Sequence, residues 1–216
     1  AQIIIDLEHR DQLLDWSLEQ VSSTEIVGHR ISRAWAQEQH FYFYLQTSSA
    51  INFVDYFSND KTKPTKIALR FTNLKDNSLM LKVGVSAVSI QGAKANLNAE
   101  ANHWDFNKYK EDVQDKWEKA LSKIEVTGDL LDQKKIFYTA LYHSMIAPNI
   151  FQDLNGEYRG SDRKVYKDTT FTNYTLFSLW DTYRAAHPLY TITHPERVSD
   201  MVNSMIKIFE QQGKLP

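Results

Sequence analysis

The sequence predicts an α+β protein with more than one domain, in which an antiparallel β-sandwich precedes a helical region. Three observations support this prediction. The hydrophobic pattern has a period of two up to about residue 90. It changes to the helical period of 3.6 beyond about residue 107. The chain of 216 residues is also 42% hydrophobic, which is enough to bury one sizeable core or two smaller ones.

The first part of the chain contains several short segments that favour β-structure. Residues 40–45 are β-prone throughout, and residues 66–71 alternate between polar and apolar side chains. Residues 79–86 form a longer apolar strand, in which Gly84 would allow another backbone to approach closely. Short strands separated by polar turns are typical of an antiparallel sandwich, which we place in residues 1–90.

The second part of the chain shows apolar residues at helical spacing. Proline cannot donate its backbone nitrogen, so we expect one helix to end before Pro188. The pair Asn155-Gly156 favours a β-hairpin within this helical region. The last helix should begin with the capping-box spacing of Thr193 to Glu196. Helices are predicted over residues 109–124, 137–145 and 176–187, and from residue 193 onward.

Composition and motifs exclude several classes of function. Twenty-five Lys and Arg against 27 Asp and Glu give a net charge of −2, which does not favour a nucleic-acid partner. No apolar run reaches the roughly 20 residues that span a membrane. The chain has no cysteine, so disulfides and thiolate metal sites are excluded. We find no Gly-rich phosphate loop, no HExxH, no GxSxG and no EF-hand loop, and the seven histidines show no metal-ligand spacing.

The segment Trp180-Asp181-Thr182-Tyr183-Arg184 carries the most promising chemistry. If this segment is helical, Asp181 and Arg184 are neighbours at positions i and i+3. A carboxylate, a guanidinium and an indole together suit a pyranose, because they offer acceptors and donors for hydroxyl groups and a flat surface for its C–H face. The alternative is a helix ion pair beside a core tryptophan, and spacing alone favours that alternative.

A set of segments occurs along the chain in an order that resembles one known family. The first are Gly28-His29-Arg30, Trp35-Ala36, Lys82-Val83-Gly84-Val85-Ser86, Ala95-Asn96-Leu97 with Glu100, and Trp104-Asp105-Phe106. The later ones are Phe137-Tyr138-Thr139-Ala140-Leu141-Tyr142-His143, Ala147-Pro148-Asn149, Tyr158-Arg159-Gly160, Phe177-Ser178-Leu179-Trp180-Asp181-Thr182-Tyr183-Arg184 and His187-Pro188-Leu189. This ordered set, which covers nearly the whole chain, resembles glycoside hydrolase family 92. That family comprises calcium-dependent exo-α-mannosidases abundant in Bacteroidetes.

The resemblance implies a fold and a reaction. The fold is an N-terminal β-sandwich, a helical linker and an (α/α)6 barrel, with the active site at their interface. Residues 1–90 would be part of the sandwich, 91–128 the linker and 129–216 the incomplete start of the barrel. The implied reaction removes terminal mannose with inversion, by a Glu acid, an Asp base and a Ca²⁺ that holds the mannose hydroxyls and the water. Inversion requires the two carboxyl groups to lie roughly 6.5–9.5 Å apart.

The resemblance also limits what this chain can contribute. It places the acid, the base and the calcium ligands beyond Pro216, so we name no catalytic or metal-binding residue here. We expect the chain to be an internal piece of a longer bacterial protein, periplasmic or secreted to the cell surface, and to be inactive alone. Near the terminal-mannose pocket, we expect Asp181 to accept hydrogen bonds from sugar hydroxyls. Arg184 would orient Asp181, and Trp180 would shape the wall of the pocket.

Two other functions fit the sequence. One is a non-catalytic carbohydrate-binding or interaction protein made of a sandwich and a few helices. The other is a different (α/α)6 glycosidase, or a glycoside phosphorylase, with a similar plan. A longer chain that continues with helices and an acidic pair would favour an enzyme over the binding protein.

Overall fold

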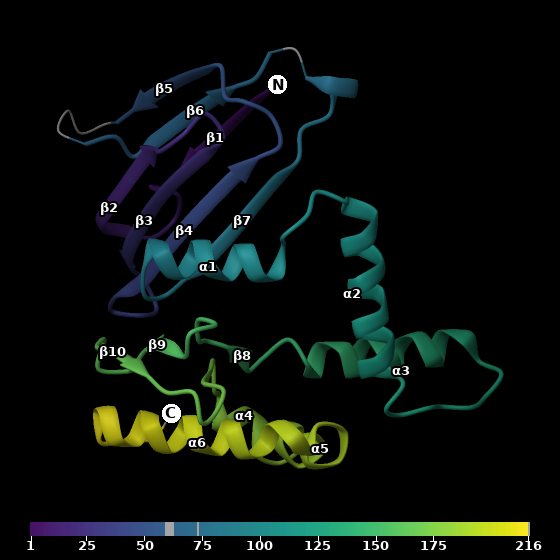
Figure 1. Ribbon diagram of the computed structural model, residues 1–216. Coiled ribbons are helices and arrows are strands. Elements are labelled where there is room, and N and C mark those ends of the chain that lie inside the picture. Colours follow the sequence, from purple (N-terminus) through teal and green to yellow (C-terminus); the bar gives the residue numbers. More distant parts are fainter. Residues whose placement is uncertain (59–62, 73, 216) are drawn as a thin grey trace. The chain divides into compact units, whose positions relative to one another are not determined.

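The N-terminal region forms the predicted sandwich in the computed structural model, which describes residues 1–58, 63–72 and 74–215 (Figure 1). One sheet has the strand order β1-β6-β5 and the other has the order β2-β3-β4-β7. The pairings are antiparallel, as the alternating pattern predicted. The strands are β1 (Gln2–Asp6), β2 (Gln12–Gln20), β3 (Glu25–Arg33), β4 (Gln39–Thr47), β5 (Phe53–Phe57), β6 (Lys66–Arg70) and β7 (Leu81–Ser86), with a short 3₁₀ turn η1 (Lys75–Asn77) before β7.

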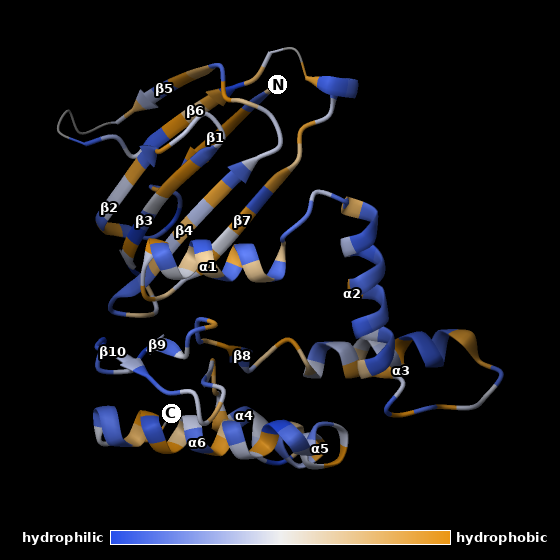
Figure 2. Ribbon diagram, in the orientation of Figure 1, coloured by the Kyte–Doolittle hydropathy of each residue, from blue (hydrophilic) through white to orange (hydrophobic). Residues whose placement is uncertain are grey.

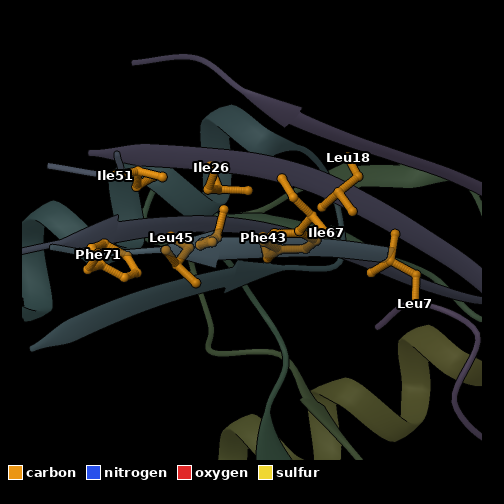
Figure 3. Packing of buried hydrophobic residues seen from close by; sticks show 9 residues of the cluster. Leu7, Leu18, Ile26, Phe43, Leu45, Ile51, Ile67 and Phe71 are labelled. Atoms are coloured by element: carbon orange, nitrogen blue, oxygen red, sulfur yellow. The ribbon is translucent and has the colours of Figure 1, made fainter. Parts of the chain in front are cut away.

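The two sheets bury an apolar core between them (Figure 3). Side chains two residues apart on a strand point to the same face, so Phe43 and Leu45 of β4 both enter this core. They meet Ile26 of β3 and Ile67 and Leu69 of β6. Ile26, Ile67 and Leu69 have no exposed surface. Burial of an aliphatic side chain contributes about 1.5–3 kcal/mol, so this core accounts for much of the stability of the sandwich.

Helix α1 (Ile90–Glu100) covers the opposite face of the four-stranded sheet (Figure 1). Val27 and Tyr44 of the sheet pack against Ala93 of the helix. Gly84 of β7 lies directly beneath, where a Cβ atom would come 2.2 Å from the carbonyl oxygen of Ala93. The close backbone approach predicted at Gly84 is therefore confirmed, and it is the packing of this helix that requires glycine there.

The remaining described elements are short strands and helices. Figure 2 shows α2 as largely hydrophilic, and no residue of α2 is buried. Helix α6 is amphipathic instead, and it buries Met201 and Ser204. The elements are α2 (Phe106–Leu121), α3 (Leu131–Ser144), β8 (Asn149–Ile150), β9 (Glu157–Arg159), β10 (Val165–Lys167), β11 (Tyr174–Thr175), α4 (Leu179–Thr182), α5 (Ala186–Thr193) and α6 (Pro195–Gln212).

The chain divides into two units that do not follow the sequence order. The first unit contains the sandwich and α1, together with β9 and β10 from much later in the chain. The second unit contains the other helices with β8 and β11. The bounds of the first unit are residues 1–104, 153–159 and 165–167, and those of the second are 105–152, 160–164 and 168–216.

The hairpin predicted around Asn155-Gly156 is wrong in its pairing. A tight turn does form, with Gly156 at a φ of 85° and the Asp153 N–H donating to the carbonyl oxygen of Glu157 at 2.7 Å. The strands on its two sides pair elsewhere, however, because β9 pairs with β10 and β8 pairs with β11. The dipeptide therefore determines the local turn, while β9 pairs with the next strand in the chain and β8 pairs with the more distant β11.

The helix predicted over residues 176–187 and the capping box predicted for the last helix are also wrong. The helix expected over residues 176–187 consists of α4 alone, followed by turns, and α5 begins at Ala186. Pro188 lies in the first turn of α5, where backbone N–H groups have no partner within the helix, so proline is tolerated there. Helix α6 begins as predicted, but without a capping box, because the Thr193 hydroxyl donates to Leu189 of the preceding helix instead.

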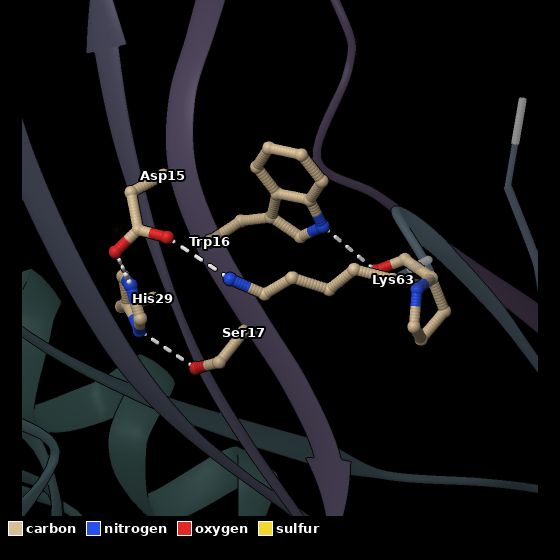
Figure 4. Close-up of polar contacts among 6 residues, drawn as sticks. Asp15, Trp16, Ser17, His29 and Lys63 are labelled. Carbon is tan, nitrogen blue, oxygen red and sulfur yellow. Dashed lines mark hydrogen bonds and ion pairs between the residues drawn. The ribbon is translucent and has the colours of Figure 1, made fainter. Parts of the chain in front are cut away.

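A polar cluster joins β2, β3 and the segment before β6 (Figure 4). The ring of His29 contacts the Ser17 hydroxyl at 2.6 Å through Nδ1 and the Asp15 carboxylate at 2.9 Å through Nε2. Lys63 donates to the other carboxylate oxygen of Asp15 at 2.9 Å, and the Trp16 indole donates to the Pro64 carbonyl at 3.0 Å. A carboxylate can only accept, so Nε2 carries the proton in the neutral ring and Nδ1 accepts from Ser17. We interpret the cluster as structural, because it holds β2 and β3 against the segment before β6.

This cluster leads to a pH-dependent contribution to stability. Hydrogen bonds from His29 and then Lys63 lower the pKa of Asp15 from 3.8 to about 2. Because the folded-state pKa is below the unfolded one, charged Asp15 stabilises the fold above pH 4, and this contribution is lost as the pH falls toward 2. The side chain of Asp15 is 56% exposed, so solvent screening limits the contribution to about 1 kcal/mol or less. Asp15→Asn should lower the Tm at pH 7, and its Tm should converge with that of the unmodified chain near pH 2. A difference that is the same at both pH values would contradict this assignment.

Candidate functional site

The candidate segment lies on the single turn α4 and the residues that follow it. The chain enters this turn from β11, where Tyr174 is buried and its N–H donates to the Ser204 hydroxyl of α6 at 2.9 Å. Leu176 then adopts a left-handed φ of 63°. This conformation is uncommon for a leucine, and it turns the backbone before α4 begins. Strand and helix packing therefore hold the start of the segment in place.

Asp181 is oriented by a serine three residues earlier. The Ser178 hydroxyl donates to Oδ2 of Asp181 at 2.5 Å, and the Asp181 N–H donates to the Ser178 carbonyl at 3.0 Å. The carboxylate is exposed, and within the described part of the chain no donor reaches its second oxygen. An aspartate held by one oxygen, with the other free to accept, suits a hydrogen bond from a ligand hydroxyl.

Arg184 does not contact Asp181, contrary to the neighbour relation that a helix would give. Its Nε donates to the Tyr183 hydroxyl at 2.5 Å, and its guanidinium carbon lies 5.1 Å from the centre of that ring. Helix α4 ends at Thr182, so Arg184 falls outside the helix and the i, i+3 geometry is lost. Among the described residues there is no ion pair between Asp181 and Arg184, whose partners are Ser178 and Tyr183.

Trp180 presents its indole to solvent. Its exposed fraction is 86%, and that of the neighbouring Tyr183 is 48%. An exposed indole offers a flat apolar face on which the C–H surface of a sugar ring can stack. Neither the helix ion pair nor the core tryptophan of the structural alternative is found in the described part of the chain. The segment offers instead an oriented carboxylate, a guanidinium and an exposed indole.

Aromatic packing supports the segment from its C-terminal side. The His187 ring stacks on Phe177 with ring centres 6.3 Å apart, and it meets the edge of Tyr190 at 5.5 Å. Burial lowers the pKa of His187, so its ring stays neutral at pH 7. The Tyr190 hydroxyl donates toward the carbonyl oxygens of Ser144, the last residue of α3, and of Ala147, at 2.7 and 3.0 Å. These contacts hold α5 against Phe177, which precedes α4, and against the end of α3.

Sequence reasoning missed the partner that orients Asp181. The signal was present, because Ser178-Leu179-Trp180-Asp181 has the Ser-x-x-Asp spacing that brings both side chains together at a helix start. The exposed Trp180 could not be distinguished from a core residue by spacing. Tyr183 belongs to the predicted segment, but its role as the acceptor for Arg184 depends on where α4 ends.

The described residues provide neither a metal site nor a membrane span. No group of three or more His, Asp or Glu side chains in the described ranges could hold a metal ion. The side chains of the described residues therefore do not provide a site that fits a calcium ion, which takes about 6–8 oxygen ligands. No helix among the described residues is long and apolar enough to cross a membrane.

Several known proteins are similar to this chain. A family GH92 α-mannosidase from Bacteroides thetaiotaomicron, also solved in complex with mannoimidazole, has 30% identity and a TM-score of 0.88. The alignment covers all of this chain and 31% of that one. A GH92 inverting mannosidase from the same organism has 22% identity and a TM-score of 0.86, and it is covered over 30% of its length. An uncharacterized secreted glycosidase of Arthroderma benhamiae is 26% identical over 176 residues, which are 79% of this chain and 18% of that protein.

Family comparison assigns nearly all of the chain. The N-terminal domain of glycosyl hydrolase family 92 matches residues 1–86. The catalytic domain of the same family matches residues 92–216. The chain spans about a third or less of the length of these relatives. This chain belongs to glycosyl hydrolase family 92.

Proposed function

We propose that the chain is part of an exo-acting α-mannosidase, which removes terminal mannose from mannose-rich glycans with inversion of configuration. The observation that carries the proposal is the 30% identity over the full chain to a GH92 α-mannosidase whose fold it shares, with a TM-score of 0.88. The mannoimidazole complex of that relative supports a mannose-containing substrate. In this proposal residues 1–90 belong to the sandwich domain, 91–128 to the linker and 129–216 to the start of an (α/α)6 barrel.

Within this function we assign substrate binding to Trp180, Asp181 and Arg184. The Asp181 oxygen that does not contact Ser178 accepts a hydrogen bond from a hydroxyl group of the terminal mannose. The exposed face of Trp180 packs against the C–H surface of the sugar ring. The Nε group of Arg184 donates to Tyr183, so Arg184 does not orient Asp181. Its remaining N–H groups donate directly to the sugar.

The remaining groups that the reaction needs are proposed to come from the rest of the protein. An inverting hydrolysis needs an acid and a base, separated by roughly 6.5–9.5 Å to admit a water molecule. The described residues also lack a cluster that could bind a metal. As the resemblance to the family implies, we assign the Glu acid, the Asp base and the Ca²⁺ ligands to parts of the protein outside residues 1–216. We further propose that the protein is exported, since the relative from Arthroderma benhamiae is described as secreted. We propose a bacterial source because two structural relatives are from Bacteroides thetaiotaomicron.

An assay with the whole protein tests this proposal. The whole protein should hydrolyse an aryl α-mannoside in the presence of calcium and lose this activity when a chelator is added. An NMR time course should show β-mannose as the first product. The 216-residue chain alone should show no turnover above the blank. An aryl α-glucoside is the matched control, because it differs from the mannoside only at C2 and should not react. Hydrolysis of the glucoside alone, or first release of α-mannose, would contradict the proposal.

A further inference from the structure

A buried carboxylate joins the turn before β9 to the turn between β7 and α1. Asp153 is only 6% exposed, which is rare for an aspartate. The Ser86 hydroxyl donates to its Oδ2 at 2.6 Å, and the Asn96 amide donates to its Oδ1 at 2.8 Å. All three residues belong to the first unit. A buried carboxylate without hydrogen bonds is strongly unfavourable, so these contacts are required for the segment to dock.

The two partners of Asp153 are themselves held on both sides. The Ser86 oxygen also accepts from the backbone N–H groups of Val88 and Ser89, at 2.9 and 3.2 Å. The Asn96 side chain accepts from the Leu154 N–H at 3.1 Å, while its amide group also donates to the Val85 carbonyl at 2.9 Å. The turn before β9 and the β7–α1 turn therefore share one hydrogen-bond network.

The start of helix α1 provides favourable electrostatics for the Asp153 charge. A Cβ atom at Gly92 would lie 2.2 Å from Oδ2 of Asp153, so the carboxylate rests directly on the first turn of the helix. The unpaired N–H groups at a helix start form its positive end, which stabilises a nearby anion. Glycine at position 92 is what allows the carboxylate to approach this closely.

A second set of contacts continues along β9 and β10. The Nε of Arg159 donates to the Ala87 carbonyl at 2.8 Å. Tyr158 is buried, and its ring stacks on that of Tyr166 with centres 5.8 Å apart. We define residues 153–159 together with β10 as the strap. The strap lies some 70 residues beyond the β7–α1 turn in sequence, yet it is part of the same unit.

We propose that Asp153 is the latch of this strap, and that the strap and the β7–α1 turn open together when the Asp153 hydrogen bonds break. The family N-terminal domain ends at residue 86 and the strap lies in the catalytic-domain match, so the latch makes one folding unit out of parts of both. The proposal is independent of the activity proposed above. It concerns only the first unit, in which every contact used here lies.

Hydrogen–deuterium exchange of the whole protein tests the latch. Asp153→Asn keeps the shape of the side chain but replaces one acceptor oxygen with an NH₂ donor. In one orientation this donor faces the Asn96 NH₂ group, which is also a donor. In the other it faces the Ser86 oxygen, which already accepts from two backbone N–H groups. Exchange should accelerate at least tenfold in two peptides, 86–92 and 153–159, which corresponds to about 1.4 kcal/mol. Exchange in β3 should stay unchanged. Asp162→Asn, in the loop between β9 and β10, is the matched control and should leave residues 86–92 unaffected.

The second variant reaches the latch from the helix side. Alanine normally stabilises a helix relative to glycine. Gly92→Ala should instead accelerate exchange in both peptides, because its methyl group displaces the Asp153 carboxylate. If Asp153→Asn does not fold, Gly92→Ala decides the question alone. Acceleration in only one of the two peptides, in neither, or equally in β3 would overturn the proposal.

Discussion

Replacing Gly84 with alanine should lower the free energy of unfolding by about 3 kcal/mol, at the upper end of the typical cost of overpacking. The new Cβ would lie 2.2 Å from the Ala93 carbonyl oxygen and 2.7 Å from the Leu97 Cβ atom. The first of these is backbone, which cannot rotate away as a flexible side chain could. Helix α1 must therefore move off the sheet, and its contacts with Val27 and Tyr44 weaken. Urea denaturation followed by circular dichroism measures the change.

Gly213→Ala is the matched control for this prediction. Gly213 follows α6 and also lacks a side chain, but a Cβ atom added there would meet no described atom within 4 Å. Its φ of 76° is left-handed, so alanine costs about 1–2 kcal/mol from backbone strain alone. Equal effects at positions 84 and 213 would show that close packing of α1 is not what requires glycine at position 84.

The sandwich could be predicted from sequence because its faces differ. Residues of β4 such as Phe43 and Leu45 enter the core between the sheets, while Tyr44 faces α1. The alternation follows from the geometry of a strand, and it is visible in the sequence of residues 66–71, where Ile67, Leu69 and Phe71 enter the core. The role of Gly84 was predictable for the same reason, because a glycine inside an apolar strand indicates close approach of another segment.

The strap could not be predicted, because nothing local identifies it. The Asn155-Gly156 pair favours a turn, and a turn forms, but β9 pairs with β10, the strand that follows it in the chain. Asp153 carries no pattern that distinguishes it from a surface aspartate. Its burial arises from Ser86 and Asn96, which are 67 and 57 residues away in the chain. Long-range hydrogen bonds of this kind leave no periodic signal.

The sequence indicated the segment of the candidate site but not the positions of its side chains. Its residue types suggested sugar binding, and the structure shows Trp180 exposed and Asp181 oriented. The predicted relation between Asp181 and Arg184 failed because it assumed a continuous helix. That helix ends at Thr182, and the position of a helix end depends on tertiary packing as well as on local sequence.

Asp181→Asn in the whole protein should reduce kcat/KM for an aryl α-mannoside at least about tenfold. The substitution keeps the shape of the side chain but removes its charge, and hydrogen bonds to charged groups contribute roughly 1.5–3 kcal/mol. The Tm should change little, because Asp181 is exposed and its described partner is the Ser178 hydroxyl. Asp168→Asn is the control, since Asp168 likewise accepts from a nearby hydroxyl, that of Thr170, at 2.6 Å.

The two measurements together separate the possible roles of Asp181. A large loss of kcat/KM with an unchanged Tm supports contact with the sugar. A lower Tm with a proportionate loss of activity would instead assign Asp181 to the local fold, because a structural contact acts on the amount of folded enzyme. If neither quantity changes, and Asp168→Asn behaves identically, Asp181 does not bind substrate. The remaining site assignment would then depend on Trp180, whose indole is the most exposed aromatic surface of the segment.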